Sequence, residues 1–447
     1  MASLTDCPIE LLNQIFRGLP QADLASLCKA QSTLRKAALP LLYENIHFRW
    51  TETNTPPIIQ FLRSVLACPD LALHVRRLEL LGMTFQKTTP YSAPKIPVDS
   101  DSISPLVSAI ESLCLPYQSS WVEHLRAGTM DAFTALLIAR VPKLRSLCMD
   151  GNFAREAGLF SNVLRSALCD HNGTGLPGFE HVHNVVSQSA RGRTRAALFS
   201  NTESVLPLFY LPNLRKLEVV IDTPQSGVIE WPISPPRLSN LTSLELWWLR
   251  ETSLEQVLRA TPCLKSLTWH WVHKADKEEL PWGRTVNLEM VASALGYVKD
   301  TLEDLIITSA VYIGVHEIEY DSMEVRGNLR SLSAFHLKTL EMPWPFFVGL
   351  STDCGLKLGD VVPTSVEHLT LSEGLPMIAE FEWEYEEIIE RLLEYLGGLQ
   401  QSDARLRKLH LVANHDSFGW ASHTRWRKRL ADACSEHEVE FGVIQDY

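Results

Sequence analysis

Residues 212–219 read Pro-Asn-Leu-Arg-Lys-Leu-Glu-Val, and residues 241–246 read Leu-Thr-Ser-Leu-Glu-Leu. The shared core is L-x-x-L-x-L, often with a proline before it. Related cores occur at residues 75–80, 144–149, 264–269, 302–307, 337–342, 366–371 and 406–411. A phrase repeated nine times along one chain indicates one structural unit used repeatedly.

The L-x-L part of the phrase predicts a short strand. Its two apolar residues are two positions apart and therefore lie on the same face of a strand. One such strand cannot bury its face alone, so each copy needs neighbours on both sides, as in a solenoid. The phrase resembles the leucine-rich repeat. The steps between successive cores are uneven, from 23 residues (Leu244 to Leu267) to 70 residues (Leu147 to Leu217). We therefore expect an α/β fold in which short parallel strands and helical crossovers form an irregular solenoid.

Several segments between the cores have helical signatures. Thr252 and Glu255 are spaced as a capping box, and Asn287 precedes a run of periodic apolar residues. Residues 384–396 and 423–436 are also predicted to be helical, the latter as a cap on the last repeat. The polar stretches 86–104 and 170–204 are expected to be loop insertions.

The amino-terminal stretch has a different pattern. Residues 7–48 contain three short apolar-periodic segments separated by turn signals such as Gly18-Leu19-Pro20, and Asp23 is a candidate cap for the second helix. A helical unit of about 40 residues usually needs outside help to be stable. Its surplus apolar surface favours a role in docking to another protein.

This stretch resembles an F-box. The matching residues are Pro8, Ile9, Glu10, Leu11, Leu12, Ile15, Phe16, Leu19, Pro20, Asp23, Leu24, Leu27, Leu34, Arg35, Ala38, Pro40, Leu42, Tyr43 and Ile46. Cys7 and Leu34 stand where the family usually has Leu and Trp, and both are apolar. Phrases in the second half, such as residues 301–305, 328–332 and 363–369, resemble those of filamentous-fungal F-box proteins with leucine-rich repeats. The domains would then be an F-box over residues 1–50 and an irregular leucine-rich-repeat domain over residues 51–447.

The resemblance implies binding to the Skp-type adaptor of a cullin–RING ubiquitin ligase. The residues implied in adaptor binding are Pro8, Ile9, Leu11, Leu12, Ile15, Leu19 and Leu27. We expect the chain to be the substrate-recognition subunit of a Skp–cullin–F-box ligase that binds a protein substrate through its repeats. The alternative is a leucine-rich-repeat scaffold or binding protein that works outside a ligase.

The composition limits which other classes of protein the chain could belong to. The chain has 447 residues, a net charge of −12, 45% hydrophobic and 21% charged residues, which fits a folded protein. The negative charge argues against nucleic-acid binding. Nine scattered cysteines without a CxxC pair predict a reducing compartment, the cytoplasm or nucleus. No signal peptide or membrane-length apolar run is visible, so no membrane partner is expected.

The strand alternation also predicts a surface for the substrate. Residues between the two apolar positions of each core should lie on the exposed face. We expect Glu218, Glu245, Trp247 and His270 to form an acidic patch with one aromatic anchor that binds a basic segment. By the same alternation Val220 should point outward, and Trp248 and Trp271 should point into the core. The alternative without a binding role is that the glutamates are solvated strand residues and that Trp247 packs under a loop.

Known catalytic and cofactor motifs are missing from the sequence. No P-loop, GxGxxG, GxSxG or HExxH occurs. Cys169, Asp170, His171, His181 and His183 have weak metal-ligand spacing and are better explained as loop residues. The basic run 191–195 is expected to be a solvated loop, and the acidic run 380–387 the first turn of a helix. We therefore expect no enzyme activity, no cofactor and no metal.

Overall fold

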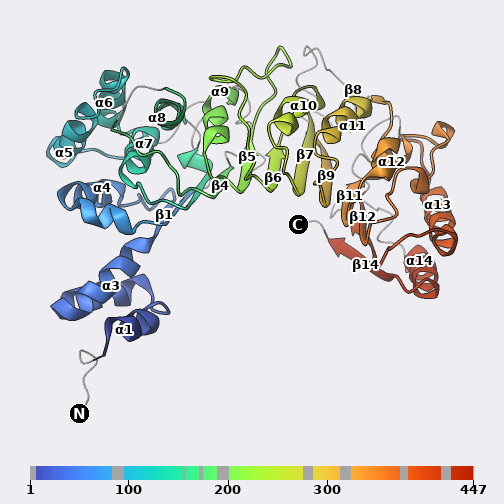
Figure 1. Ribbon diagram of the computed structural model, residues 1–447, viewed down its shortest axis with the longest axis horizontal. Coiled ribbons are helices and arrows are strands. Elements are labelled where there is room, and N and C mark those ends of the chain that lie inside the picture. Colours follow the sequence, from blue (N-terminus) through green and yellow to red (C-terminus); the bar gives the residue numbers. More distant parts are fainter. Residues whose placement is uncertain are drawn as a thin grey trace. The chain divides into compact units, whose positions relative to one another are not determined.

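The structure is a computed structural model. It describes residues 7–82, 95–154, 157–170, 175–188, 201–274, 285–312, 324–372, 381–413 and 424–445. The chain divides into two compact units, Met1–Val219 with Trp231–Ser234, and Val220–Glu230 with Pro235–Tyr447. Each unit is α/β, with parallel strands that follow one another in chain order (Figure 1). The expected α/β class with parallel strands is confirmed.

The first unit begins with three helices, α1 (Ile9–Phe16), α2 (Gln21–Ala30) and α3 (Ser32–Glu44). Their shared core consists of Leu12, Phe16, Leu24, Leu34, Ala37 and Ala38, with Cys7, Leu19, Leu27, Cys28, Leu41 and Leu42 packed against it. Asp23 is not the helix cap that its sequence position suggested. The residue before α2 is Pro20, which makes no side-chain capping bond. The backbone N–H of Asp23 donates to the Pro20 carbonyl, so Asp23 lies in the first turn.

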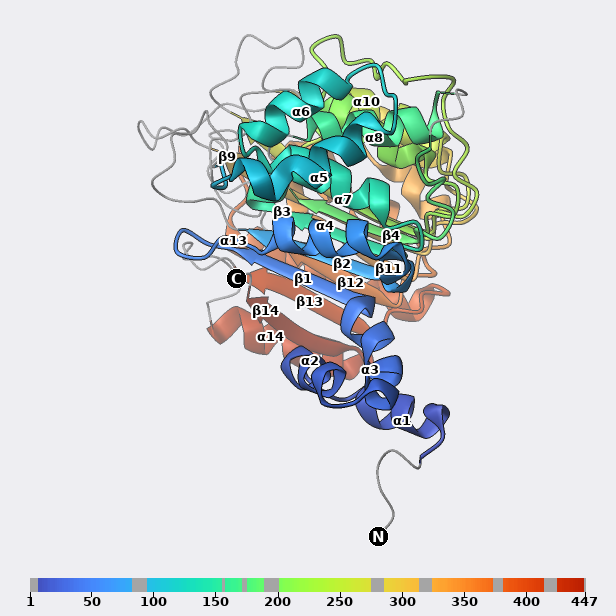
Figure 2. The ribbon, with the colours of Figure 1, turned by 90° about the vertical axis from the view of Figure 1, so that its left-hand side faces the viewer.

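Five parallel strands follow in the first unit. They are β1 (Asn45–Trp50), β2 (Arg77–Gly82), β3 (Ser146–Asp150), β4 (Asn184–Gln188) and β5 (Lys216–Val220). The crossovers contain α4 (Ile58–Ala67), η2 (Pro69–His74), α5 (Ser100–Glu111), α6 (Gln118–Arg126), α7 (Met130–Arg140), η3 (Gly151–Phe153), α8 (Gly158–Leu168), α9 (Thr202–Val205) and η5 (Leu206–Tyr210). Figure 2 shows α4 and α7 lying beside β1, β2 and β3.

Helix α7 is the centre of the helical layer in this unit. Each of its residues from Met130 to Ala139 is buried. Asp131 is 7% exposed, and its carboxylate accepts hydrogen bonds from the N–H groups of Leu159 (2.7 Å) and Phe160 (3.0 Å). A carboxylate at this position satisfies free N–H groups in the first turn of α8. Asp131 therefore joins α7 to α8 by side-chain chemistry as well as by packing.

The second unit contains seven parallel strands. They are β6 (Ser243–Trp247), β7 (Ser266–Lys274), β9 (Asp304–Tyr312), β11 (Thr339–Pro343), β12 (His368–Ser372), β13 (Lys408–Ala413) and β14 (Glu440–Gln445). A separate parallel pair joins β8 (Thr285–Asn287) to β10 (Glu324–Arg326). The helices are α10 (Glu251–Arg259), α11 (Leu288–Gly296), η7 (Arg330–Ala334), α12 (Trp344–Val348), η8 (Thr352–Cys354), η9 (Leu358–Asp360), α13 (Tyr385–Gly398), η10 (Leu399–Gln401) and α14 (Thr424–Glu436).

All nine L-x-x-L-x-L cores contain a strand, as predicted. The two apolar residues of each L-x-L are at most 4% exposed in every case, from Leu78 and Leu80 in β2 to Leu409 and Leu411 in β13. The side chains therefore alternate as the phrase requires. This confirms the strands and their inward face, whereas the leucine-rich-repeat assignment stays a prediction.

Five described strands lie outside the phrase. β8 and β10 form the separate pair, and β1, β4 and β14 pair with strands that contain the phrase. β1 begins at Asn45, so the chain passes directly from α3 into the sheet. β4 lies inside 170–204, the stretch expected to be a polar insertion, and β14 follows α14. Residues 86–94 of the other expected insertion, 86–104, lie outside the described residues, and α5 begins at Ser100. The predicted boundary between domains at residue 50 stays a prediction.

The predicted crossover helices are present, with one error in detail. The Asn287 side chain caps α11 by accepting from the N–H groups of Glu289 and Met290. Helices α13 and α14 lie where residues 384–396 and 423–436 predicted them. The capping box at Thr252 is wrong. Helix α10 begins at Glu251, which places Thr252 inside the first turn.

A buried ion pair fixes the start of α10. Arg250 and Glu251 are 5% and 2% exposed, and two hydrogen bonds of 3.0 and 3.1 Å join the guanidinium to the carboxylate. Arg250 also donates to the carbonyl of Thr285, and Trp271 donates to Glu251. The pair thus connects α10 with β7 and β8.

Glu303 lies between two lysines at the start of β9 and predicts an acid-sensitive contribution to stability. Hydrogen bonds from Lys338 (2.6 Å) and Lys265 (2.9 Å) lower the pKa of Glu303 from 4.5 to about 2. Because the folded pKa lies below the unfolded one, the stabilisation is present above the unfolded pKa and is lost as the pH falls towards 2. The melting temperature of Glu303→Gln should therefore lie below that of the wild type at neutral pH. This difference in melting temperature should disappear as the pH is lowered from 5 to about 2. A gap that is constant across this range would contradict the prediction.

Candidate functional site

Helix α1 presents an apolar face that its own helical unit does not bury. Leu12 and Phe16, four residues apart, face the core at 1% exposure each. Ile9, Leu11 and Ile15 are 45%, 50% and 51% exposed. Large apolar side chains this exposed and this close in sequence are typical of a surface that binds another protein. Leu11 and Ile15, four residues apart, share one side of α1, whereas Ile9, two residues before Leu11, lies on another side. We call these three exposed residues together the α1 face.

The seven residues implied in adaptor binding have three different environments. Pro8 and the α1 face are exposed, Leu19 and Leu27 are half-buried against the core, and Leu12 is buried. Leu12 therefore supports the helical unit from within and has no surface to offer a partner. The carbonyl of Pro8 accepts from the N–H groups of Leu11 and Leu12 (3.1 Å each) and so starts the helix that carries the face.

The structure brings together three of the four residues predicted to bind substrate. Trp247 in β6 is directly opposite His270 in β7, and their rings stack with centroids 3.5 Å apart. Trp247 Nε1 donates to Glu245 Oε1 (3.0 Å), which also lies 3.2 Å from His270 Nε2. His270 Nδ1 lies 2.7 Å from the hydroxyl of Thr308. The cluster is real, but its carboxylate already has partners within it, so a role in binding a basic segment stays a prediction.

Glu218 does not have the expected environment. It belongs to β5 and is only 5% exposed. The same argument from alternation was wrong for Val220, which is 3% exposed. Trp271 is buried as expected, whereas Trp248 is half-buried and has a φ of 70°. That left-handed backbone interrupts the alternation just after β6.

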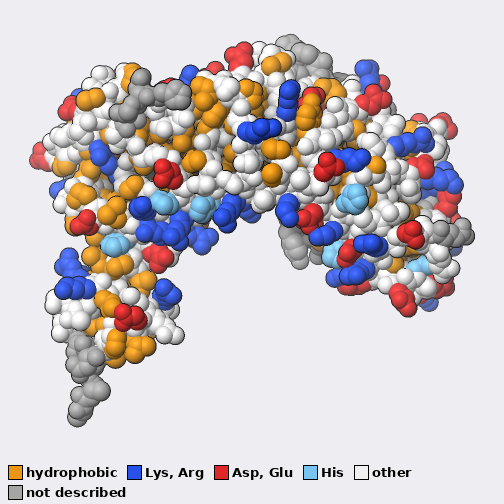
Figure 3. Space-filling view, in the orientation of Figure 1, with side chains coloured by type: hydrophobic (Ala, Val, Ile, Leu, Met, Phe, Trp, Pro, Cys, Tyr) orange, Lys and Arg blue, Asp and Glu red, His pale blue; other side chains and the backbone are white. Residues whose placement is uncertain are grey.

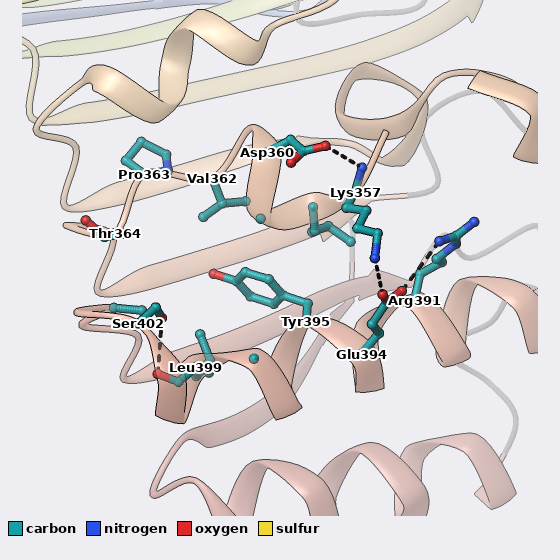
Figure 4. Close-up of a pocket in the computed structure, with 14 residues that line it drawn as sticks. Lys357, Asp360, Val362, Pro363, Thr364, Arg391, Glu394, Tyr395, Leu399 and Ser402 are labelled. Carbon is teal, nitrogen blue, oxygen red and sulfur yellow. Dashed lines mark hydrogen bonds and ion pairs between the residues drawn. The ribbon is translucent and has the colours of Figure 1, made fainter. Parts of the chain in front are cut away.

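The second unit also has a pocket of about 240 Å³ beside α13 (Figure 4). Its floor is apolar, with Leu358, Val362, Pro363 and Leu399, and Tyr395 reaches across it. Lys357 and Glu394 pair at 2.5 Å on one side. Burial raises the pKa of Tyr395. The Ser402 hydroxyl donates to the Leu399 carbonyl.

The candidate metal residues do not converge in the described part of the chain. His181 Nε2 lies 3.0 Å from Lys143 Nζ, and His183 Nδ1 lies 3.0 Å from the carbonyl of Asn213. The described residues contain no group of three or more His, Cys, Asp or Glu arranged to hold a metal ion. His171 and the basic run 191–195 lie outside the described residues. No helix in the described ranges is long and apolar enough to cross a membrane.

Comparison with known proteins does not assign the chain to a family. No protein-family model matches it, and no curated protein is significantly similar to it. The features that characterise the protein are therefore its α/β fold with parallel strands and the exposed apolar face on its amino-terminal helices.

Proposed function

We propose that the chain is the substrate-recognition subunit of a Skp–cullin–F-box ubiquitin ligase, acting in the cytoplasm or nucleus. The observation that carries the proposal is the α1 face, three large apolar side chains that are 45% to 51% exposed. They belong to the same stretch whose sequence resembles an F-box. The array of parallel strands supports the second half of the proposal, because stacked repeats provide the extended surfaces that bind proteins.

The α1 face can supply useful binding energy. Complete burial of a Leu or Ile side chain contributes about 1.5–3 kcal/mol. Since only 45% to 51% of each side chain is exposed, the contribution on docking is smaller for each of them. A few such residues on a pre-formed helix are nevertheless sufficient for a stable interface when they occupy pockets of the partner.

The proposed mechanism is proximity. The adaptor and cullin would be held at the helical unit and the substrate at the strand array, so a ubiquitin-loaded enzyme on the same scaffold meets substrate lysines at high effective concentration. No bond is made or broken by the chain itself in this proposal.

Co-purification tests the proposal. The tagged full-length chain is expected to recover a Skp-type adaptor and, through it, cullin. Leu11→Ala with Ile15→Ala should lower the recovery of both by about tenfold or more, because the contacts are apolar and the two alanines keep the helix. The matched control is Val228→Ala with Met290→Ala, two apolar residues of the second unit that are 51% and 37% exposed. The control should recover as much adaptor as the wild type.

Two outcomes would overturn the proposal. Equal recovery from the wild type and the α1-face variant would remove its main support. Recovery of adaptor without cullin would instead indicate a strand-repeat scaffold that works outside a ligase.

A further inference from the structure

One row of residues in the first unit has an unusual charge pattern. In each repeat, the residue before the strand donates its backbone N–H to the carbonyl of the equivalent residue one repeat earlier. Arg145 donates to Arg76 (2.8 Å), His183 to Arg145 (2.9 Å) and Arg215 to His183 (2.8 Å). Arg76 in turn donates to Glu44 (2.9 Å), the residue before β1. The row at the amino-terminal ends of the strands therefore runs Glu44, Arg76, Arg145, His183 and Arg215, with neighbours about 4.8 Å apart.

The equivalent row in the second unit has alternating charge. It runs Lys265, Glu303, Lys338, Glu367, Arg407 and Glu440, each donating to the one before it at 2.7–2.8 Å. Ion pairs join Lys265 and Lys338 to Glu303, and Arg407 to Glu367 (3.1 Å). The second unit thus neutralises this row with its own side chains.

Four cations at or beside the row of the first unit are not neutralised in this way. The cations Lys143 and Lys216 flank the row, and we call Arg76, Lys143, Arg145, His183, Arg215 and Lys216 the basic edge. Among the described residues, Arg76, Lys143, Arg145 and Lys216 form no ion pair with a carboxylate. Arg76 donates to the carbonyls of Leu73 and Val75, and Lys143 contacts His181. In Figure 3, Lys, Arg and His side chains gather around and just below the places where Figure 1 labels β1 and β4.

A cluster of this kind favours an anionic partner. Like charges this close together repel one another, and they do so more strongly near a protein surface than in bulk water. The chain as a whole has a net charge of −12, so the basic edge is a local exception. Lys143, Arg145, Arg215 and Lys216 are exposed and can therefore reach a ligand. An anion bound here would relieve the repulsion and gain charge-assisted hydrogen bonds.

The dimensions fit an extended peptide. The basic part of the row, from Arg76 to Arg215, spans three strand spacings, about 14 Å, which is the length of four or five extended residues. The basic edge contains no Phe, Tyr or Trp side chain, the residues that single-stranded nucleic-acid sites normally use to stack bases. The negative net charge also opposes the long phosphate backbone of a nucleic acid.

We propose that the basic edge binds a short, extended acidic segment of a partner protein. This rests on the proposed function in that the segment would belong to the captured substrate. Direct binding to the purified chain tests it without the adaptor, so failure here and failure of co-purification are separate results.

The experiment uses the full-length chain and fluorescently labelled probes in an anisotropy titration. The probes are a short peptide of alternating Glu and Ser, its phosphoserine form, a Gln/Ser peptide and an oligo-dT of similar length. We expect both acidic peptides to bind, with affinity that falls as salt is added, and the Gln/Ser peptide not to bind. The stronger of the two acidic peptides shows whether carboxylates or phosphates are preferred.

Matched variants locate the site. Arg145→Glu with Lys216→Glu should weaken binding of the acidic peptides by about tenfold or more. Arg407→Glu with Lys408→Glu changes the net charge equally at the corresponding positions of the second unit and should leave binding nearly unchanged. A milder variant, Arg145→Gln with Lys216→Gln, covers the case in which charge reversal impairs folding.

Three outcomes would overturn the proposal. The first is that the wild type binds neither acidic peptide at low salt. The second is that both charge-reversal variants lose the same affinity. The third is that oligo-dT binds more tightly than the peptides. The last result would make a nucleic acid the occupant of the edge.

Discussion

Glu251→Ala is expected to lower the free energy of unfolding of the second unit by about 3–5 kcal/mol, because it leaves the charge of Arg250 buried without its carboxylate. Arg250 is 5% exposed, and Glu251 is the acid to which its guanidinium donates at 3.0 and 3.1 Å. The change also removes an acceptor of the Trp271 indole N–H and of the Asn287 backbone N–H. Urea unfolding followed by circular dichroism measures the shift.

Glu255→Ala is the matched control on the same helix. Glu255 is less buried and accepts one hydrogen bond, from the hydroxyl of Tyr297, so its loss should cost about 1 kcal/mol or less. Replacing both members of the pair, Arg250→Met with Glu251→Leu, should destabilise less than Glu251→Ala alone, because no buried charge is left uncompensated. A double variant less stable than the single one would show that the pair stabilises the unit by more than mutual neutralisation.

Leu12→Ala should destabilise the amino-terminal helices by about 2–5 kcal/mol, the usual cost of truncating a buried leucine. The six-residue core of this unit includes Leu12 at 1% exposure, so little else can compensate. Hydrogen exchange should become faster at the amides of α1, α2 and α3, and remain unchanged in the second unit.

The neighbouring leucine separates stability from binding. Leu11 is 50% exposed, so Leu11→Ala should change the stability of the helices by no more than about 0.5 kcal/mol. If Leu11→Ala accelerates exchange as much as Leu12→Ala does, the orientation of α1 described here is wrong.

The repeated phrase predicted much of the sheet. It located nine strands and their buried positions because the two-residue alternation of a strand can be recognised from residues that are neighbours in the sequence. It missed β1 although Ile46, Phe48 and Trp50 alternate there, since that strand lacks the leucine phrase. β4 and β14 were missed for the same reason. Their positions depend on pairing with a strand that lies tens of residues away in the sequence, and a local pattern does not reveal that pairing.

The candidate site was predictable only in part. Alternation says which face of a strand a residue occupies, but not what covers that face. Glu245, Trp247 and His270 were therefore grouped correctly, whereas Glu218 and Val220 were expected to be exposed and are buried. The Thr252 capping box failed because α10 begins one residue earlier, at Glu251, where the buried Arg250–Glu251 pair lies. The exposure of Ile9, Leu11 and Ile15 also needed the structure, since the sequence pattern did not distinguish them from Leu12.

Within each unit the strands are adjacent in space in the same order as in the chain. Each new strand therefore pairs with one that the ribosome has already released. At about 5–20 residues per second, β1 and β2 can pair while most of the chain is still unmade, and no early strand has to wait for a distant partner. The three amino-terminal helices leave the ribosome before every strand. A protein built in this order can fold its amino-terminal helices during its own synthesis, while most of the strands are still unmade.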